Sequence, residues 1–288
     1  MTRPEISFEF FPPQTLEASF RLWDTVQVLA PLAPRFVSVT YGAGGTTRDL
    51  TRDAVATLHR SSGLRVAAHL TCVNATREET LGIARGFAEA GVKELVALRG
   101  DPPKGSGPFV PHPDGFANSV ELIAALAESG DFTIRVGAYP DQHPEAANAQ
   151  ADIDWLKAKL DAGASEALTQ FFFEAETFFR FRDACAKAGI DHAITPGILP
   201  IENWKGARNF ARNCGTHIPA WVEDAFGNAR NKDEEDLLAT ALCAELCSDL
   251  IAGGVDKLHF YTLNRPELTR DVCHAIGVTP RRPLKKVA

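Results

Sequence analysis

Eight short apolar runs alternate with longer helix-like segments along the 288 residues of this chain. Each run has the length and residue types of a buried strand, and most begin roughly 25–40 residues after the one before. Nearly every interval contains a helical pattern, and this alternation predicts a parallel (β/α)8 barrel, the TIM-barrel fold. The predicted strands span residues 6–11, 36–42, 65–72, 94–100, 133–140, 167–173, 193–198 and 257–263.

Residue types at the ends of the helical segments support these boundaries. Thr76, with Glu79 three residues later, predicts a capping box, and Gly91, Gly163 and Gly189 each follow an alanine-rich segment, as a helix-ending glycine does. The interval between residues 198 and 257 is the widest, so we expect extra helices before the last strand. The predicted helices span residues 16–32, 47–61, 76–90, 117–129, 147–162, 175–188, 202–213, 220–226 and 233–251.

We expect a single catalytic domain over residues 1–288, with a basic tail from about residue 278. No linker, low-complexity tract or shift in composition marks a second domain. The main alternative fold is a doubly wound parallel sheet, which is disfavoured because no G-x-G-x-x-G sequence follows the first strand.

Charge and composition exclude several classes of protein. The net charge of −7 argues against nucleic-acid binding, because a phosphate backbone requires a basic face. No apolar run approaches the roughly 20 residues that span a bilayer, so no membrane segment is expected. The six cysteines include no C-x-x-C pair and indicate reduced thiols in a cytoplasmic protein.

Glu9 is the most unusual residue of the first predicted strand. It lies in Ile6-Ser7-Phe8-Glu9-Phe10-Phe11, a run closed by two prolines. A carboxyl group among apolar side chains is expected to have a raised pKa, which suits a proton donor near neutral pH. A buried ion pair with an arginine or lysine is an equally good explanation of Glu9 by position alone.

Polar side chains collect at the C-terminal ends of the predicted strands, where TIM barrels carry their active sites. Each has an ordinary structural explanation, such as a βα turn, a surface ion pair or a core histidine, but their convergence favours a ligand site. The set comprises Glu9, Thr40, Tyr41, His69, Thr71, Arg99, Asp101, Tyr139, His143, Thr169, Gln170, His259, Tyr261 and Arg265.

These segments, taken in order, resemble the methylenetetrahydrofolate reductase family, of the bacterial single-domain type. Any one of them is a weak signal, whereas the ordered set covers nearly the whole chain. The matching stretches are Phe8–Pro13, Val37–Ala43, His69–Cys72, Ala97–Asp101, Ala138–Pro140 with His143–Glu145, Thr169–Phe173, Pro196–Pro200 and His259–Arg265.

The resemblance implies an FAD-dependent enzyme that reduces 5,10-methylenetetrahydrofolate to 5-methyltetrahydrofolate for methionine synthesis. In the family, NADH or NADPH passes a hydride to the flavin and leaves before the folate binds, a ping-pong mechanism. Glu9 matches the general acid that protonates N10 of the folate. Bacterial relatives favour NADH, and family members are commonly homo-oligomers. No metal is implied.

The remaining roles carry over by position. Asp101 matches a residue that contacts both flavin and folate, while Gln170, Phe210 and Arg265 match residues that bind the substrates. The positions that match FAD-binding residues are Thr40, Tyr41, Ala43, His69, Arg99, Gly100, Asp101, Phe116, Ala117, Tyr139, His143, Ala146, Asp152 and Lys159.

Three other functions are compatible with part of the pattern. A metal-dependent hydrolase on the same barrel could use His69, His143, His259 and an acidic residue, although the first strand has no H-x-H pair. A Schiff-base aldolase needs a lysine at a strand's C-terminal end, where this chain has none. A folate carrier without catalytic activity would not explain the carboxyl group of Glu9, because binding alone requires no proton donor.

Overall fold

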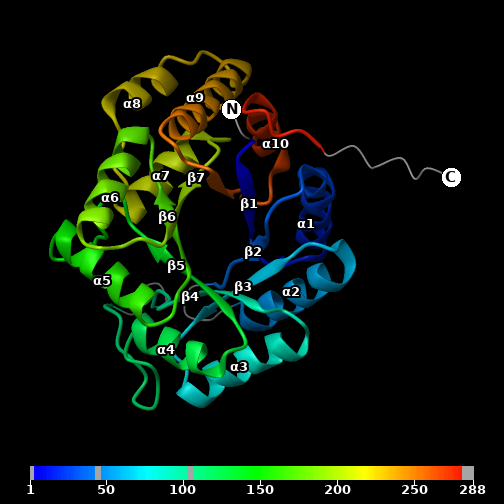
Figure 1. Cartoon of the computed structure of the whole chain (residues 1–288). Coiled ribbons are helices and arrows are strands. Elements are labelled where there is room, and N and C mark those ends of the chain that lie inside the picture. The colour runs from blue at the N-terminus through cyan, green and yellow to red at the C-terminus, as the bar shows by residue number, and fades with distance from the viewer. Residues whose placement is uncertain (1–2, 43–46, 103–104, 106, 281–288) are drawn as a thin grey trace.

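The eight predicted strands form the barrel. In a computed structural model, which describes residues 3–42, 47–102, 105 and 107–280, eight parallel strands run in sequence order and β8 pairs with β1 to close the ring (Figure 1). The TIM-barrel prediction is therefore confirmed. The strands are β1 (Glu5–Phe10), β2 (Val37–Val39), β3 (Val66–Thr71), β4 (Glu94–Leu98), β5 (Thr133–Ala138), β6 (Glu166–Phe171), β7 (Ala193–Ile198) and β8 (Lys257–Tyr261).

Helices form a ring around these strands (Figure 1). Three of them lie between β7 and β8, which confirms the extra helices. The last helix was not predicted, although Pro266 in its first turn is a helix-start signal. The helices are α1 (Leu16–Leu29), α2 (Arg48–Ser62), α3 (Arg77–Glu89), α4 (Ser119–Ser129), α5 (Ala149–Asp161), α6 (Ala175–Lys187), α7 (Trp204–Cys214), α8 (Ala220–Gly227), α9 (Lys232–Ala252) and α10 (Pro266–Ala275), with a 3-10 turn η1 (Ala30–Leu32).

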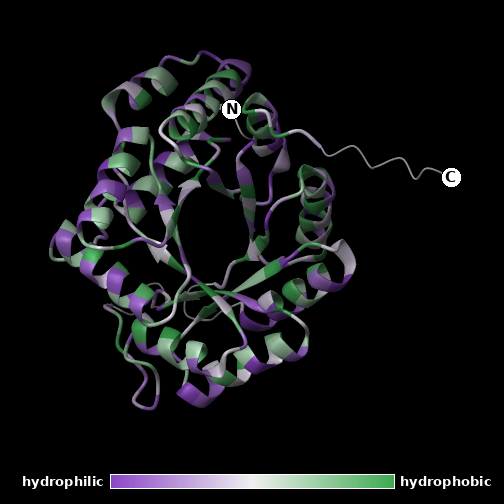
Figure 2. Ribbon diagram, in the orientation of Figure 1, coloured by the Kyte–Doolittle hydropathy of each residue, from purple (hydrophilic) through white to green (hydrophobic). Residues whose placement is uncertain are grey.

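The predicted helix ends are present. The Thr76 hydroxyl accepts a hydrogen bond from the Glu79 amide at 3.1 Å, and the Glu79 carboxylate accepts one from the Thr76 amide at 2.8 Å. Gly91, Gly163 and Gly189 follow α3, α5 and α6 with φ values of 85°, 120° and 77°, a backbone conformation that glycine adopts without steric cost. Hydrophilic residues lie mainly on the outward faces of the surrounding helices (Figure 2).

Alternate side chains of each strand face two different apolar regions, one outside and one inside the barrel. Phe8 and Phe10 point outward and belong to the main core between the strands and the helices. The intervening side chains point into the barrel, where Phe36, Ala67, Val96 and Leu168 form a second, smaller cluster. Glu9 is also on this inner face, so its neighbours inside the barrel are not the phenylalanines beside it in sequence.

A charged network closes the N-terminal end of the barrel. Arg135 on β5 is 3% exposed and donates to Glu94 and Glu166, each at 2.7 Å. Arg35 and Arg65 contact the same two carboxylates from nearer the surface. The guanidinium of Arg135 also lies 3.8 Å from the ring centre of Phe36. Because every charge of this layer has an opposite partner, it can lie inside the barrel without an uncompensated ion.

Candidate active site

Glu9 lies at the C-terminal end of the barrel interior, between two histidines. Its Oε2 atom is 3.2 Å from Nε2 of His69 on β3 and 3.6 Å from Nε2 of His259 on β8. The Nδ1 atom of His259 in turn lies 2.8 Å from the hydroxyl of Ser7. The Glu9 side chain is 15% exposed, whereas His259 is fully buried. The sequence suggested an arginine or lysine as the alternative partner of Glu9, and the structure provides two imidazoles instead.

These imidazoles overturn the expectation of a raised pKa at Glu9. Burial raises the pKa of this carboxyl group, as the sequence argument assumed, but His69 and His259 together outweigh burial and lower the pKa to about 2. The expectation was wrong because it treated neighbours in sequence as neighbours in space. In this arrangement Glu9 is ionised, with an imidazole nitrogen on either side of its carboxylate and the Ser38 hydroxyl donating to Oε2 at 3.5 Å.

The backbone beside Glu9 is tied to the end of β8. The hydroxyl of Thr262 donates to the Glu9 carbonyl oxygen at 2.7 Å. The Asn264 side chain accepts from the Phe11 amide at 2.9 Å and donates to the Phe11 carbonyl oxygen at 3.0 Å. These bonds join the first and last strands where the barrel closes, so they fix the backbone from which the Glu9 side chain projects.

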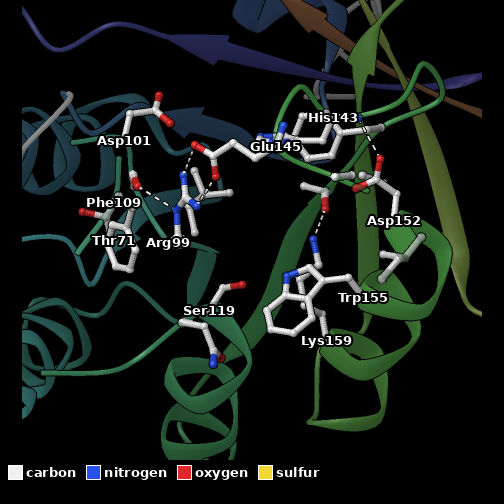
Figure 3. A pocket seen from close by; sticks show the side chains of 18 of the residues that line it. Thr71, Arg99, Asp101, Phe109, Ser119, His143, Glu145, Asp152, Trp155 and Lys159 are labelled. Carbon is white, nitrogen blue, oxygen red and sulfur yellow. Dashed lines mark hydrogen bonds and ion pairs between the residues drawn. The ribbon is translucent and has the colours of Figure 1, made fainter. Parts of the chain in front are cut away.

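A cavity of about 550 Å³ opens at the same end of the barrel (Figure 3). It extends outward from the strand ends between α4 and α5, and its volume is typical of a small-molecule site. Its lining includes Tyr41, Thr71, Arg99, Gly100, Asp101, Phe109, Ala117, Asn118, Ser119, Gly137, Tyr139, His143, Glu145, Ala146, Ala151, Asp152, Trp155, Leu156 and Lys159.

Arg99 supplies a cation at the end of β4. Its guanidinium pairs with the Glu145 carboxylate at 2.5 Å and lies 4.7 Å from the ring centre of Phe109 (Figure 3). The hydrogen bond with Glu145 raises the pKa of Arg99 and lowers that of Glu145. Glu145 is largely exposed, so a bound anion can compete with it for Arg99.

Lys159 supplies a second cation, from α5. It is only 7% exposed, and its ammonium group donates to the Gly137 carbonyl oxygen at 2.5 Å. Burial lowers its pKa from 10.5 to about 8, and Asp152 partly offsets this effect. Asp152 itself accepts a hydrogen bond from the His143 amide at 2.7 Å. A buried lysine on a cavity wall is suited to binding an anion, because the anion restores its charged form.

The wall near the end of β3 also favours a polar ligand. The Thr71 hydroxyl is buried and, among the described residues, has no hydrogen-bond partner, although Thr71 lines the cavity. Gly100 has a φ of 85°, and a Cβ atom there would lie 2.8 Å from Cβ of Thr71. Glycine therefore lets the backbone after Arg99 pass close to Thr71. Two cations and an unpartnered hydroxyl on the wall of one cavity suit an anionic, polar ligand.

Most of the residues matched to FAD binding lie together in this cavity. Thr40 and His69 are not part of its lining, and the fully buried Phe116 packs in the core, below the guanidinium of Arg77. Ala43 lies outside the described residues. The matched residues that line the cavity are Tyr41, Arg99, Gly100, Asp101, Ala117, Tyr139, His143, Ala146, Asp152 and Lys159.

The residues matched to substrate binding are spread over the neighbouring elements. Gln170 is on β6, and its side-chain oxygen accepts a hydrogen bond from the Phe171 amide at 3.1 Å. Phe210 on α7 is 40% exposed and stacks on Phe171, with ring centres 5.3 Å apart. Arg265, just before α10, pairs with Glu202 at 3.1 Å. Of this group, only Asp101 lines the cavity.

The metal-hydrolase alternative required four ligands that the fold divides between two places. His69, His259 and Glu9 are inside the barrel, whereas His143 lies on the cavity wall against Tyr139. In the part of the chain that the structure describes, no group of three or more histidine, cysteine, aspartate or glutamate side chains is arranged to hold a metal ion.

Sequence reasoning missed several residues of the cavity wall, namely Phe109, Ser119, Glu145 and Trp155. The start of α4 carried a usable signal, because Asn118 followed by an apolar run is a typical N-cap. Trp155 had no such signal, since its helix also has outward-facing positions. Its place on the cavity wall follows from how α5 packs on the barrel.

The fold and this cavity define a TIM-barrel protein with a cavity at the C-terminal strand ends, the end at which the acidic residue Glu9 lies inside the barrel. The family model described as Methylenetetrahydrofolate reductase matches residues 1–277. The 5,10-methylenetetrahydrofolate reductases of Salmonella typhimurium and Escherichia coli are each 46% identical to this chain over 276 residues, covering 96% of it and 91% of the relative. The chain belongs to the methylenetetrahydrofolate reductase family.

Solved structures support the fold alone. A Clostridium thermocellum protein, described as uncharacterized and as binding two copies of 5-methyl-5,6,7,8-tetrahydrofolic acid, aligns with a TM-score of 0.61 at 12% identity, over 96% of this chain and 95% of that one. Within the described residues, no helix is long and apolar enough to span a membrane.

Proposed function

We propose that this protein reduces 5,10-methylenetetrahydrofolate to 5-methyltetrahydrofolate, with FAD as its cofactor and NADH or NADPH as the electron donor. The observation that carries the proposal is the position of Glu9. The carboxyl group lies at the C-terminal end of the barrel interior, the same end at which a cavity opens whose cations suit a dinucleotide. Family membership supports the reaction, because the relatives at 46% identity are named for it.

The cavity residues support FAD as the cofactor by their chemistry. Arg99 and Lys159 would bind its phosphates, and the Thr71 hydroxyl would donate to a polar atom of the ligand. When bound, FAD would accept a hydride from the nicotinamide and donate one to the folate. Asp101 lines the cavity at the end of β4, and a carboxylate near the flavin disfavours its anionic reduced form.

Glu9 is the proposed acid for N10 of the folate. Because the Glu9 carboxyl group is ionised in the ligand-free protein, it must gain a proton before it can act as an acid. A folate covering the barrel mouth would exclude water and favour a neutral carboxyl group. His69 and His259 flank the carboxylate and would orient it for this proton transfer.

Gln170, Phe210 and Arg265 are the proposed folate contacts outside the cavity. Gln170 offers an amide at the C-terminal end of β6, and the exposed ring of Phe210 offers a stacking surface for a flat heterocycle. Arg265 would exchange Glu202 for a carboxylate of the folate's glutamate tail. The nicotinamide would use the same surface before the folate, with NADH the expected donor.

We also infer a cytoplasmic homo-oligomer that acts on small molecules. The inference is supported by the family resemblance and by six cysteines that are all unpaired, as in a reducing compartment.

Anaerobic stopped-flow absorbance tests the reaction directly. The purified protein is mixed with NADH or NADPH, and flavin bleaching is followed. Methylenetetrahydrofolate is then added to the reduced protein, and recovery of the flavin absorbance is expected. A protein that carries no flavin, or a reduced flavin that the folate does not reoxidise, would contradict the proposal.

A further inference from the structure

One face of α5 forms a wall of the cavity. Ala151, Trp155 and Lys159 are spaced four residues apart, so their side chains lie above one another on the same side of the helix. The indole of Trp155 points from this face into the cavity, toward Ser119 at the start of α4 (Figure 3). Trp155 is the bulky member of the stripe, and 44% of its surface is exposed.

A second tryptophan of similar exposure lines a different hollow of the molecule. Trp221, on α8, is 46% exposed but is not part of this cavity. The wall that Trp155 faces includes the small residue Ser119 (Figure 3). A large flat ring facing a small side chain leaves a slot that suits a planar heterocycle, and indole is a strong stacking surface.

The position of the cations indicates which heterocycle lies there. FAD has a ring system at each end and two phosphates between them, and Arg99 and Lys159 are the cations of the cavity. The flavin must approach the barrel mouth, because the proposed proton donor Glu9 is inside the ring of strands. Trp155 belongs to α5, in the outer ring of helices (Figure 1), one turn from the cation Lys159, so we assign it to the ring system on the far side of the phosphates from the barrel mouth.

We propose that Trp155 stacks on the adenine ring of the bound dinucleotide and so positions the cofactor's AMP half between α4 and α5. The inference rests on the proposed function, because it requires FAD in this cavity. It adds a ligand contact that the family resemblance did not include.

Equilibrium titration of the flavin-free, full-length protein tests the contact. FAD binding is followed by flavin fluorescence, and ADP and FMN are tested separately as probes of the two halves. Trp155→Ala is expected to weaken FAD and ADP binding by about 5- to 100-fold while leaving FMN binding within about twofold, since stacking on an aromatic side chain contributes roughly that factor per base. Trp155→Phe, which keeps an aromatic ring, is expected to retain most of the affinity.

Trp221→Ala is the matched control, because it removes an equally exposed indole elsewhere, and FAD affinity is expected to stay unchanged. Unaltered FAD affinity in Trp155→Ala would overturn the inference, as would a loss confined to FMN. A wild-type protein that binds no FAD would instead contradict the proposed function, so the two failures can be told apart. Circular dichroism of each variant confirms that the fold is intact.

Discussion

Glu9 and His69 come from β1 and β3, which are not neighbouring strands, yet Oε2 of Glu9 lies 3.2 Å from Nε2 of His69. Both side chains point into the barrel, where residues from non-adjacent strands meet across its interior. This contact, together with His259, makes Glu9 an ionised carboxylate with a low pKa. The behaviour of Glu9 is therefore a property of a cluster.

Replacement of Glu9 separates the two half-reactions. Glu9→Gln is expected to retain FAD and to be reduced by the nicotinamide at nearly the wild-type rate. Folate reduction is expected to fall by about 10²- to 10⁴-fold, the usual contribution of a general acid. Stopped-flow absorbance measures both steps. Glu5→Gln, at the exposed start of the same strand, serves as the control and is expected to alter neither. An equal loss in both half-reactions would rule out the assigned role.

Asp101 is expected to set the reduction potential of the flavin. Its side chain lines the cavity, and the negative charge opposes an anionic reduced flavin. Asp101→Asn is therefore expected to raise the potential and to slow reduction of the folate, because a stronger oxidant is a weaker hydride donor. Spectroelectrochemical titration measures the potential, and an unchanged value would count against this account.

Lys159 couples cofactor binding to pH. Its pKa in the ligand-free protein is about 8 rather than 10.5, and a bound phosphate favours the charged form, so binding above pH 8 takes up a proton. FAD affinity is expected to weaken as the pH rises from about 8, by at most tenfold per pH unit. Lys159→Met is expected to bind FAD more weakly and to lose this pH dependence.

The control for this experiment is Lys157→Met, which removes an exposed lysine of the same helix that pairs with Asp161. Its FAD affinity and pH profile are expected to match the wild type.

The free energy of unfolding of the ligand-free protein supplies a second readout. Between pH 8 and 10.5 the unfolded chain binds a proton at Lys159 that the folded protein has released, so the free energy of unfolding rises with pH there. A Lys159→Met protein whose FAD affinity keeps the wild-type pH profile would argue against a phosphate contact.

Arg135 and Arg65 both pair with Glu94, but they differ in burial. Arg135→Met leaves Glu94 and Glu166 without their inner partner and is expected to lower the free energy of unfolding by about 3–5 kcal/mol. Arg65→Met removes a side chain that is 66% exposed and is expected to cost no more than about 1 kcal/mol. Urea denaturation of both variants measures the difference. Equal effects would show that burial of the network is not what makes Arg135 important.

The arrangement of elements followed from patterns within the chain. The Thr76–Glu79 capping box and the glycines after α3, α5 and α6 are local features, so their positions could be predicted. Predicted strands extended past the observed ends, as in β2, which spans only Val37–Val39. Of the residues predicted to continue β2, Tyr41 and Gly42 line the cavity instead of extending the strand, and composition does not distinguish the two cases.

By itself, the sequence determined the eight-unit barrel, the extra helices before β8 and the family of the protein, because periodicity and ordered motifs are properties of the chain alone. The tertiary structure decided the environment of each site residue. It placed His69 and His259 against Glu9, Phe116 in the core and Trp155 on the cavity wall. A pKa or a ligand contact depends on distances between residues far apart in sequence, and these distances exist only once the barrel closes.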